Sequence, residues 1–191
     1  MHVNSLLSAG ALIVLLLAAT AIDVRTRRIP NALVASGMLI GLAVHSLAPA
    51  GEGLFASAWG SIGIVQSLLG LAAGLGLFMP LYLLRALGAG DVKLLAMVGA
   101  WLGAPLLMGA ALLTLVAGGA MALLVMVLSR TSRQVLTNVR FMLTTALIGA
   151  QTGHLAGLEA PLPGRVRLPY ALAILVGTAA QLGWQLAQAG H

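Results

Sequence analysis

The sequence predicts an all-α, polytopic membrane protein with about six transmembrane helices, and three observations lead to this fold class. Of the 191 residues, 60% are hydrophobic and only 7% are charged, whereas a soluble domain has about 45–50% apolar and roughly 25% charged residues. The apolar residues form long uncharged runs, and the basic residues stand between those runs. Because no internal repeat or linker is evident, we expect residues 1–191 to form a single integral-membrane domain.

Each predicted span is an uncharged apolar run, because a helix needs about 20 apolar residues to cross a hydrocarbon core of roughly 30 Å. The run over residues 94–129 is too long for one crossing. Gly103, Ala104 and Pro105 are expected to divide it, since glycine permits a turn and proline favours a helix start. The fourth span is then short, and we expect neighbouring helices to shelter it. The predicted spans lie near residues 4–22, 31–49, 62–84, 92–103, 106–128 and 169–187.

The segment between the fifth and sixth spans predicts an amphipathic helix lying in the membrane interface. Polar residues recur there at helical spacing, and apolar residues fall on another face. The polar set is Arg133, Thr137, Arg140 and Thr144, and the apolar set is Leu136, Val139, Leu143 and Leu147. A seventh, weakly apolar span is the alternative.

The positions of Lys and Arg predict the orientation, because cytoplasmic loops retain these residues. If the N-terminus lies outside, the six spans place all 10 cations on the cytoplasmic side. The outer loop over residues 51–60 carries one charged residue, Glu52. A cleavable signal peptide ending near Ala21 is the alternative, but no Lys or Arg precedes that apolar run. We therefore expect an uncleaved first span.

Composition also narrows the function classes. The chain has no cysteine, and its four histidines are scattered, so we expect no disulfide, thiolate nucleophile, metal site or cofactor. The net charge of +6 comes from cations that flank apolar runs. This pattern indicates contact with the lipid bilayer and argues against nucleic-acid binding.

Asp23 and Asp91 are the candidate catalytic residues. Each adjoins a span, where an ionised side chain at membrane depth costs about 2.5–3.5 kcal/mol or more. The predicted topology puts both at the cytoplasmic edge, where packing of the first and fourth spans would bring them together. Two neighbouring carboxylates would share one proton, as an aspartic protease requires to activate water. The alternative is that each aspartate caps a helix or pairs with a nearby cation, such as Arg25 or Lys93.

Residues around Asp91 are candidates for motif support or substrate binding. Gly88 and Gly90 would let the backbone turn sharply and approach another chain closely. Lys93 could act on Asp91 or on substrate carbonyls, or its ammonium could simply extend to the interface. His45, within the second span, is expected to be a hydrogen-bonded packing residue, with a proton relay as the alternative.

Two further patterns concern packing. Trp59, Trp101 and Trp184 are expected to anchor the spans at the membrane interfaces. Small-residue pairs at four-residue spacing are expected to let helices approach closely. These pairs are Gly37 with Gly41, Gly70 with Gly74, and Gly99 with Gly103.

The motifs resemble those of a known family. Gly-Ala-Gly-Asp at residues 88–91, followed by Lys93, resembles the GxGD signature of membrane aspartyl proteases. Asp23 with Ile29, Pro30 and Asn31 resembles the first-aspartate motif of type IV prepilin peptidases. Residues 169–173, Pro-Tyr-Ala-Leu-Ala, resemble that family's proline-containing final helix, so the likeness extends over nearly the whole chain.

This resemblance implies a six-helix peptidase that removes the short basic leader of a prepilin or pseudopilin at the cytoplasmic face of the inner membrane, with Asp23 and Asp91 as the catalytic pair. Larger members carry an extra cysteine-containing domain and methylate the pilin. The chain shows neither the domain nor cysteines and so resembles the small peptidase-only branch of tight-adherence (Flp) pili. Archaeal preflagellin peptidases are a close alternative. A proton-coupled transporter or channel component is the alternative from another class.

Overall fold

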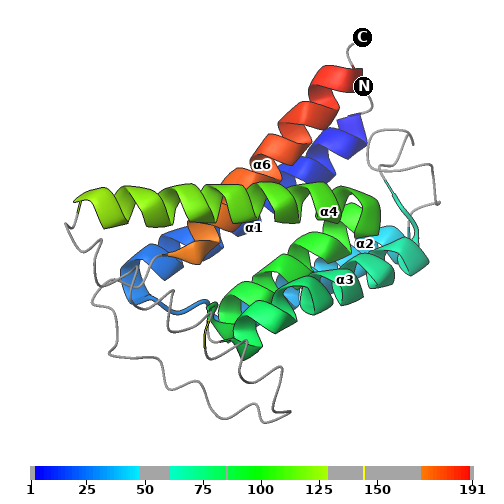
Figure 1. Cartoon of the computed structure of the whole chain (residues 1–191). Coiled ribbons are helices and arrows are strands. Elements are labelled where there is room, and N and C mark those ends of the chain that lie inside the picture. Colours follow the sequence, from blue (N-terminus) through cyan, green and yellow to red (C-terminus); the bar gives the residue numbers. More distant parts are fainter. Residues whose placement is uncertain (1–2, 48–60, 85, 129–143, 145–168, 190–191) are drawn as a thin grey trace.

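The computed structural model describes residues 3–47, 61–84, 86–128, 144 and 169–189, and the regular structure among them is entirely helical (Figure 1). Three helices precede the candidate GxGD segment, one begins within it, and one closes the described chain. They are α1 (Val3–Thr26), α2 (Asn31–Leu47), α3 (Ile64–Leu83), α4 (Ala89–Leu128) and α6 (Tyr170–Ala189).

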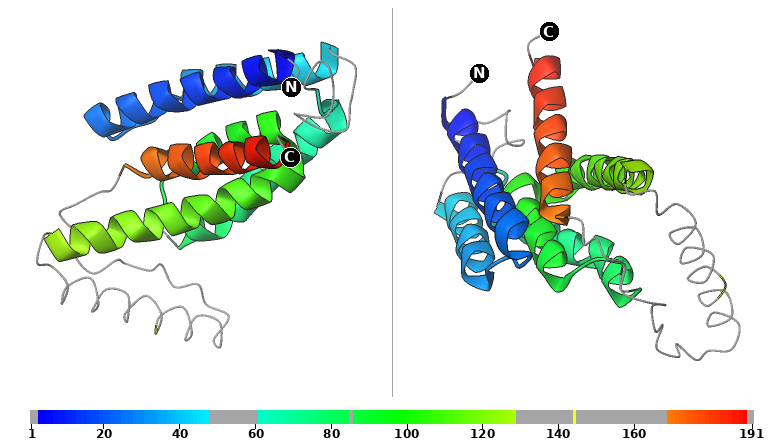
Figure 2. Two further views of the ribbon diagram at one scale, coloured as in Figure 1. Left: turned by 90° about the horizontal axis from the view of Figure 1, so that it is seen from above. Right: turned by 90° about the vertical axis from the view of Figure 1, so that its left-hand side faces the viewer.

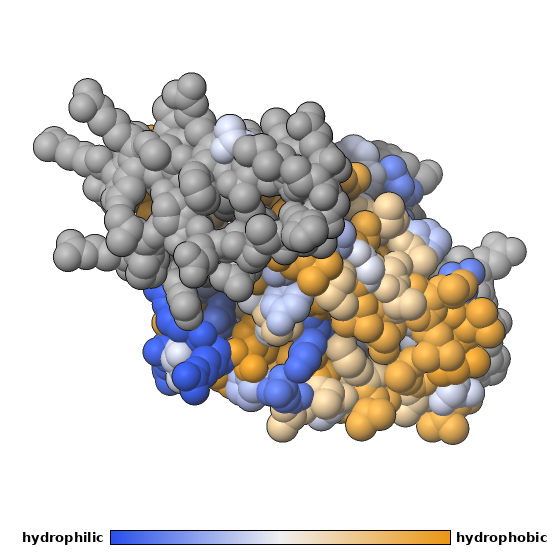
Figure 3. All heavy atoms as spheres, turned by 60° about the horizontal axis from the view of Figure 1, so that its bottom comes forward, coloured by the Kyte–Doolittle hydropathy of each residue, from blue (hydrophilic) through white to orange (hydrophobic). Residues whose placement is uncertain are grey.

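Four of these helices are long and apolar enough to cross a membrane, and the apolar α2 is shorter, at 17 residues. Large hydrophobic side chains such as Leu39, Leu112 and Val116 are exposed, as expected where helices face lipid. Figure 3 shows apolar residues over much of one face, with hydrophilic residues gathered toward one end. The predicted fold class, an all-α polytopic membrane protein, is confirmed.

A break divides α4 at the predicted place. Gly103 has φ 73° and ψ 169°, outside helical values and in the left-handed φ range that favours glycine. Pro105 follows within the helix and has no N–H to donate. The chain turns back here, so a first half over residues 89–102 and a second half over residues 104–128 run in opposite directions (Figures 1 and 2). The long apolar run therefore makes two segments.

The first half of α4 forms the centre of the core. Most of its side chains between residues 94 and 102 are fully buried, among them Leu94, Leu95, Val98 and Leu102. It packs against α2 and α3, where Gly37, Gly41, Gly70 and Gly74 face its side chains and backbone. The expectation that neighbouring helices shelter the short fourth span is confirmed.

Glycines bring the helices together as the four-residue pairs predict. A Cβ at Gly70 would meet the backbone of Gly99 and Gly103, and one at Gly74 would lie 2.7 Å from the Cα of Ala96. A Cβ at Gly41 would lie 2.8 Å from Nε1 of Trp101. Backbone therefore packs on backbone where α3 meets α4, and a large side chain fills the space beside α2.

The expectation that Trp101 anchors the membrane interface is wrong. Trp101 is buried, with 2% of its surface exposed, and its indole N–H donates to the Gly37 carbonyl oxygen at 2.9 Å. The space left by Gly41 admits the indole between helices, where its N–H is satisfied. His45 is also buried, and its Nε2 donates to the Trp101 carbonyl oxygen at 3.1 Å. His45 is thus a hydrogen-bonded packing residue, as expected.

Several predictions from sequence lie outside the described residues. They are the amphipathic helix between the fifth and sixth spans (apart from Thr144), the outer loop over residues 51–60 with Trp59, and the cations Arg85, Arg130, Arg133, Arg140, Arg165 and Arg167.

Candidate active site

Asp23 lies in the last turn of α1 and is buried, with 7% of its surface exposed. The helix ends just beyond it. The Arg27 N–H donates to the Asp23 carbonyl oxygen at 2.8 Å, and Arg27 has φ 54°. The Thr26 hydroxyl lies 2.9 Å from the Ile22 carbonyl oxygen and 3.0 Å from that of Arg28. The chain therefore leaves the buried acid through a closed, hydrogen-bonded turn.

Asp91 lies in the first turn of α4, and its carboxylate helps to start that helix. The Gly88 N–H donates to Asp91 Oδ2 at 3.0 Å. In return, the Gly88 carbonyl oxygen accepts the backbone N–H of Asp91 at 3.1 Å and that of Val92 at 3.4 Å. This is the back-bonding half of a capping box. Asp91 therefore caps its helix through one of its two carboxylate oxygens, Oδ2, as the alternative role for the aspartates predicted.

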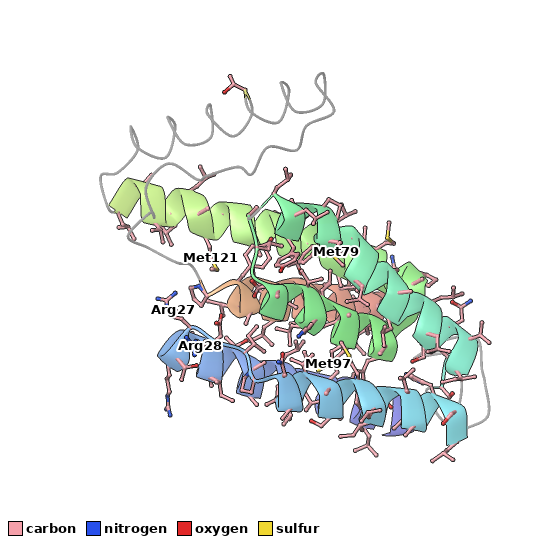
Figure 4. The ribbon with its side chains drawn as sticks, turned by 90° about the horizontal axis from the view of Figure 1, so that it is seen from below. Arg27, Arg28, Met79, Met97 and Met121 are labelled. Atoms are coloured by element: carbon pink, nitrogen blue, oxygen red, sulfur yellow. The ribbon has the colours of Figure 1, made fainter. Side chains whose placement is uncertain are left out.

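The fold brings the two aspartates to the same end of the bundle. Asp23 and Asp91 are close enough for their carboxylates to interact electrostatically. The end of α1 and the starts of α4 and α6 lie together there, where Figure 4 labels Arg27 and Arg28. Two carboxyl groups within range of each other's charge are an arrangement that can activate water by general acid–base chemistry.

The glycines of the GxGD segment provide space beside these acids. A Cβ at Gly90 would lie 3.2 Å from the Cβ of Ile29, in the turn between α1 and α2, and one at Gly88 would lie 3.2 Å from Asp91 Oδ2. Neither glycine has a positive φ. Ile29 of the same chain makes the close approach seen here, and the expected approach of another chain stays a prediction. The turn itself uses ordinary dihedral angles, so it does not require glycine's backbone freedom.

This geometry predicts that Gly90 tolerates added volume poorly. Gly90→Val should lower turnover by the acid pair by about tenfold, since overpacking costs about 1–3 kcal/mol and would push the turn at Ile29 away from α4. Gly76→Val is the control, because a Cβ there meets nothing within 4 Å. Wild-type rates for Gly90→Val at equal abundance would contradict the packing argument.

Lys93 does not simply extend to the interface. Its side chain is exposed, and its Nζ donates to Asn31 Oδ1 at 3.1 Å. Asn31 is the first residue of α2. The ammonium therefore joins the start of α2 to the first turns of α4.

Tyr170 is a residue near the site to which the sequence analysis gave no role. It is partly buried, and its ring meets that of Phe78 edge-on, with the centroids 6.0 Å apart. A Cβ at Gly118 would lie 2.9 Å from the Tyr170 hydroxyl oxygen, and Tyr170 interacts electrostatically with Asp91. The available signal was a phenol placed directly after the helix-starting Pro169.

Contacts from neighbouring elements fix the start of α6. The Thr20 hydroxyl donates to the Ala171 carbonyl oxygen at 3.2 Å, which ties α1 to α6 near the acids. Met121, from the second half of α4, lies beside the first turn of α6 (Figure 4). The described residues contain no group of three or more His, Cys, Asp or Glu that could hold a metal ion.

The fold and the site together define a class of protein: a helical membrane bundle that holds two interacting aspartates at one end. Residues 10–123, which include both aspartates, match the type IV leader peptidase family, and the chain belongs to that family. Its relatives include the prepilin leader peptidase/N-methyltransferases of two Burkholderia pseudomallei strains, 1026b and K96243. Each is 39% identical over 118 residues.

The matched region covers 61% of this chain but only 37% of each relative, so the chain spans little more than a third of the relatives' length. No solved structure matches the chain.

Proposed function

We propose that this protein is an aspartic endopeptidase that removes the short basic leader from type IV prepilins of the Flp kind. The observation that carries the proposal is the pairing of Asp23 and Asp91 at one end of a bundle whose sequence belongs to the type IV leader peptidase family. The relatives named above are leader peptidases, and the Flp assignment rests on the resemblance to the small branch. N-methylation is not part of the proposal.

In the proposed reaction, one carboxylate takes a proton from water as the water oxygen attacks the scissile carbonyl carbon. The other carboxyl group is protonated and donates a hydrogen bond to the carbonyl oxygen, on which negative charge develops. The peptide C–N bond then breaks as the carbonyl re-forms, and the leaving nitrogen takes the proton that the first carboxylate removed from water. The Gly88 N–H donates to Asp91 Oδ2, so the other oxygen of that carboxylate remains available for the proton transfer.

The position of the acids favours proteolysis over the transporter alternative. Asp23 ends one helix and Asp91 begins another, so both lie where a soluble, extended leader could reach them. A proton-coupled transporter would be expected to place its acids near the middle of the membrane.

Intact-mass measurement of a type IV prepilin tests the proposed activity. The prepilin is co-expressed with this protein or with an empty vector in a host that lacks a prepilin peptidase. Loss of the leader mass only when this protein is present supports the proposal. An intact prepilin beside abundant, membrane-inserted protein would reject it.

We further propose that the N-terminus lies outside and that the acids face the cytoplasm, in the inner membrane. Arg25, Arg27, Arg28 and Lys93 are exposed at the end of the bundle that holds the acids, and cytoplasmic ends retain such cations.

This orientation makes a labelling prediction. A single cysteine introduced within residues 51–60 should react with an impermeant maleimide in intact cells, whereas one at position 131 or 166 should react only after lysis. The chain has no native cysteine, so the background is zero. Labelling at 131 in intact cells would overturn the six-span topology.

A further inference from the structure

The turn between α1 and α2 is fastened to the start of α4 at two neighbouring points. Ile29 packs on Gly90, where an added Cβ would lie 3.2 Å away, and Lys93 donates to Asn31 Oδ1 at 3.1 Å. On α4, the residues that make these contacts stand on either side of Asp91 in the sequence, Gly90 before it and Lys93 after it. Their partners, Ile29 and Asn31, both belong to the short segment that follows Asp23.

Few other contacts hold α1 against α4. Of the helix pairs that touch in the described chain, α1 and α4 make the sparsest contact, and α1 packs mainly on α6 and α2. The position of Asp23 relative to Asp91 therefore depends on the turn and, indirectly through α6, on the hydrogen bond from Thr20 to the Ala171 carbonyl oxygen. That turn is stiffened by the Arg27 N–H on the Asp23 carbonyl oxygen and by the Thr26 hydroxyl beside the Arg28 carbonyl oxygen. Because the turn is stiff, a shift in the position of Asn31 is expected to shift Asp23 as well.

The Lys93–Asn31 hydrogen bond is a long-range contact between side chains near two helix starts. Asn31 is the first residue of α2, and its Oδ1 accepts from a residue 62 positions away. An exposed lysine at a helix start commonly extends into water. Holding its long side chain in one geometry costs entropy, and the contact gives a long-range link in return.

We propose that Asn31 is a positioning residue of the peptidase, and that its hydrogen bond with Lys93 sets the separation of Asp23 and Asp91. This inference rests on the proposed function, because the separation matters only if the two acids act together. In this proposal Lys93 acts through the hydrogen bond that it donates to Asn31, and the separation of the acids does not require an effect of its positive charge on Asp91. Neither side chain contacts the reacting atoms.

The first test measures the separation without catalysis. In an Asp23→Cys/Asp91→Cys variant, the only two thiols of the chain report how close the positions are, through thiol crosslinkers of graded length in native membranes. Adding Lys93→Met or Asn31→Leu should lower the yield of the shortest effective crosslink by about tenfold. Adding Ser36→Ala should not, because the Ser36 hydroxyl bonds the Leu33 carbonyl oxygen within α2 itself. Equal yields in all four backgrounds would overturn the positioning role, whatever the enzyme cleaves.

The second test uses cleavage of a purified type IV prepilin. Lys93→Met and Asn31→Leu should each lower kcat by about tenfold, the rate equivalent of about 1.4 kcal/mol, and leave KM within about threefold. A hydrogen bond with a charged donor contributes about that much. The double variant should be no slower than the slower single variant, because both substitutions remove the same bond.

A conservative substitution separates positioning from simple loss of stability. Asn31→Asp keeps an acceptor for Lys93 and should retain kcat within about threefold, whereas Asn31→Leu should not. Additive losses in the double variant, or equal losses for Asp and Leu at position 31, would overturn the inference. A chain that cleaves no prepilin would reject the proposed function and leave the crosslinking result to decide the positioning role.

Discussion

Asp23→Asn and Asp91→Asn are each expected to abolish leader cleavage while the protein stays inserted and abundant. Asparagine keeps the size of the side chain but cannot accept and return a proton. General acid–base catalysis contributes about 10²–10⁴-fold for each group, so the rate should fall by about a thousandfold or more. Intact-mass measurement of a co-expressed prepilin gives the cleaved fraction, and immunoblotting of the membrane fraction gives the abundance.

The matched control for this experiment is Glu52→Gln, which also removes one of only four carboxylates in the chain. The predicted topology puts Glu52 in an outer loop, and we therefore expect cleavage to continue at the wild-type rate. Wild-type turnover in either aspartate variant would remove that residue from the catalytic pair. A matching loss in Glu52→Gln would indicate a general effect of lost charge.

Gly70→Val is expected to have the largest effect on stability. A Cβ at Gly70 would overlap the Gly99 carbonyl oxygen and lie 2.7 Å from the Cα of Gly103. These atoms belong to the backbone of α4, so no side chain can rotate away and the two helices must separate. Overpacking of a core costs about 1–3 kcal/mol when side chains can adjust, and here they cannot. The melting temperature of the detergent-purified protein should fall by at least about 5 °C, with lower yield.

Gly76→Val on the same helix provides the comparison, because a Cβ there meets nothing within 4 Å. Both variants lose the same flexible glycine and gain the same β-branched side chain, so their difference isolates the contact between α3 and α4. If Gly70→Val melted with Gly76→Val, close backbone packing would not explain the glycine pair at positions 70 and 74.

The sequence predicted features that depend on local physics. Long uncharged runs predicted the helices, and Gly103 before Pro105 predicted the break in α4, because a glycine's backbone freedom and a proline's missing N–H act where they stand. The cost of an acid beside a lipid-facing span singled out Asp23 and Asp91.

Features that depend on a distant partner were not predictable in this way. The position of Trp101 in the sequence predicted a residue at the membrane interface. Its ring instead packs in the core, because Gly41 on another helix has no side chain to occupy that space. Lys93 suited an extended, hydrated side chain until Asn31 placed an acceptor beside it. Tyr170 gave only a weak signal, a phenol after Pro169, because its electrostatic interaction with Asp91 exists only once α6 has packed.

The contacts of α6 have a consequence for when the protein becomes active during its synthesis. A chain that has emerged only as far as the second half of α4 already contains both aspartates. It lacks the Ala171 carbonyl oxygen that accepts from Thr20 of α1, and it lacks the Tyr170 phenol that interacts electrostatically with Asp91. The acids therefore acquire their final surroundings only after the last described helix has been translated and inserted. Under the proposed function, a chain that stops before α6 is thus expected to be inactive toward prepilins, although it already carries both aspartates.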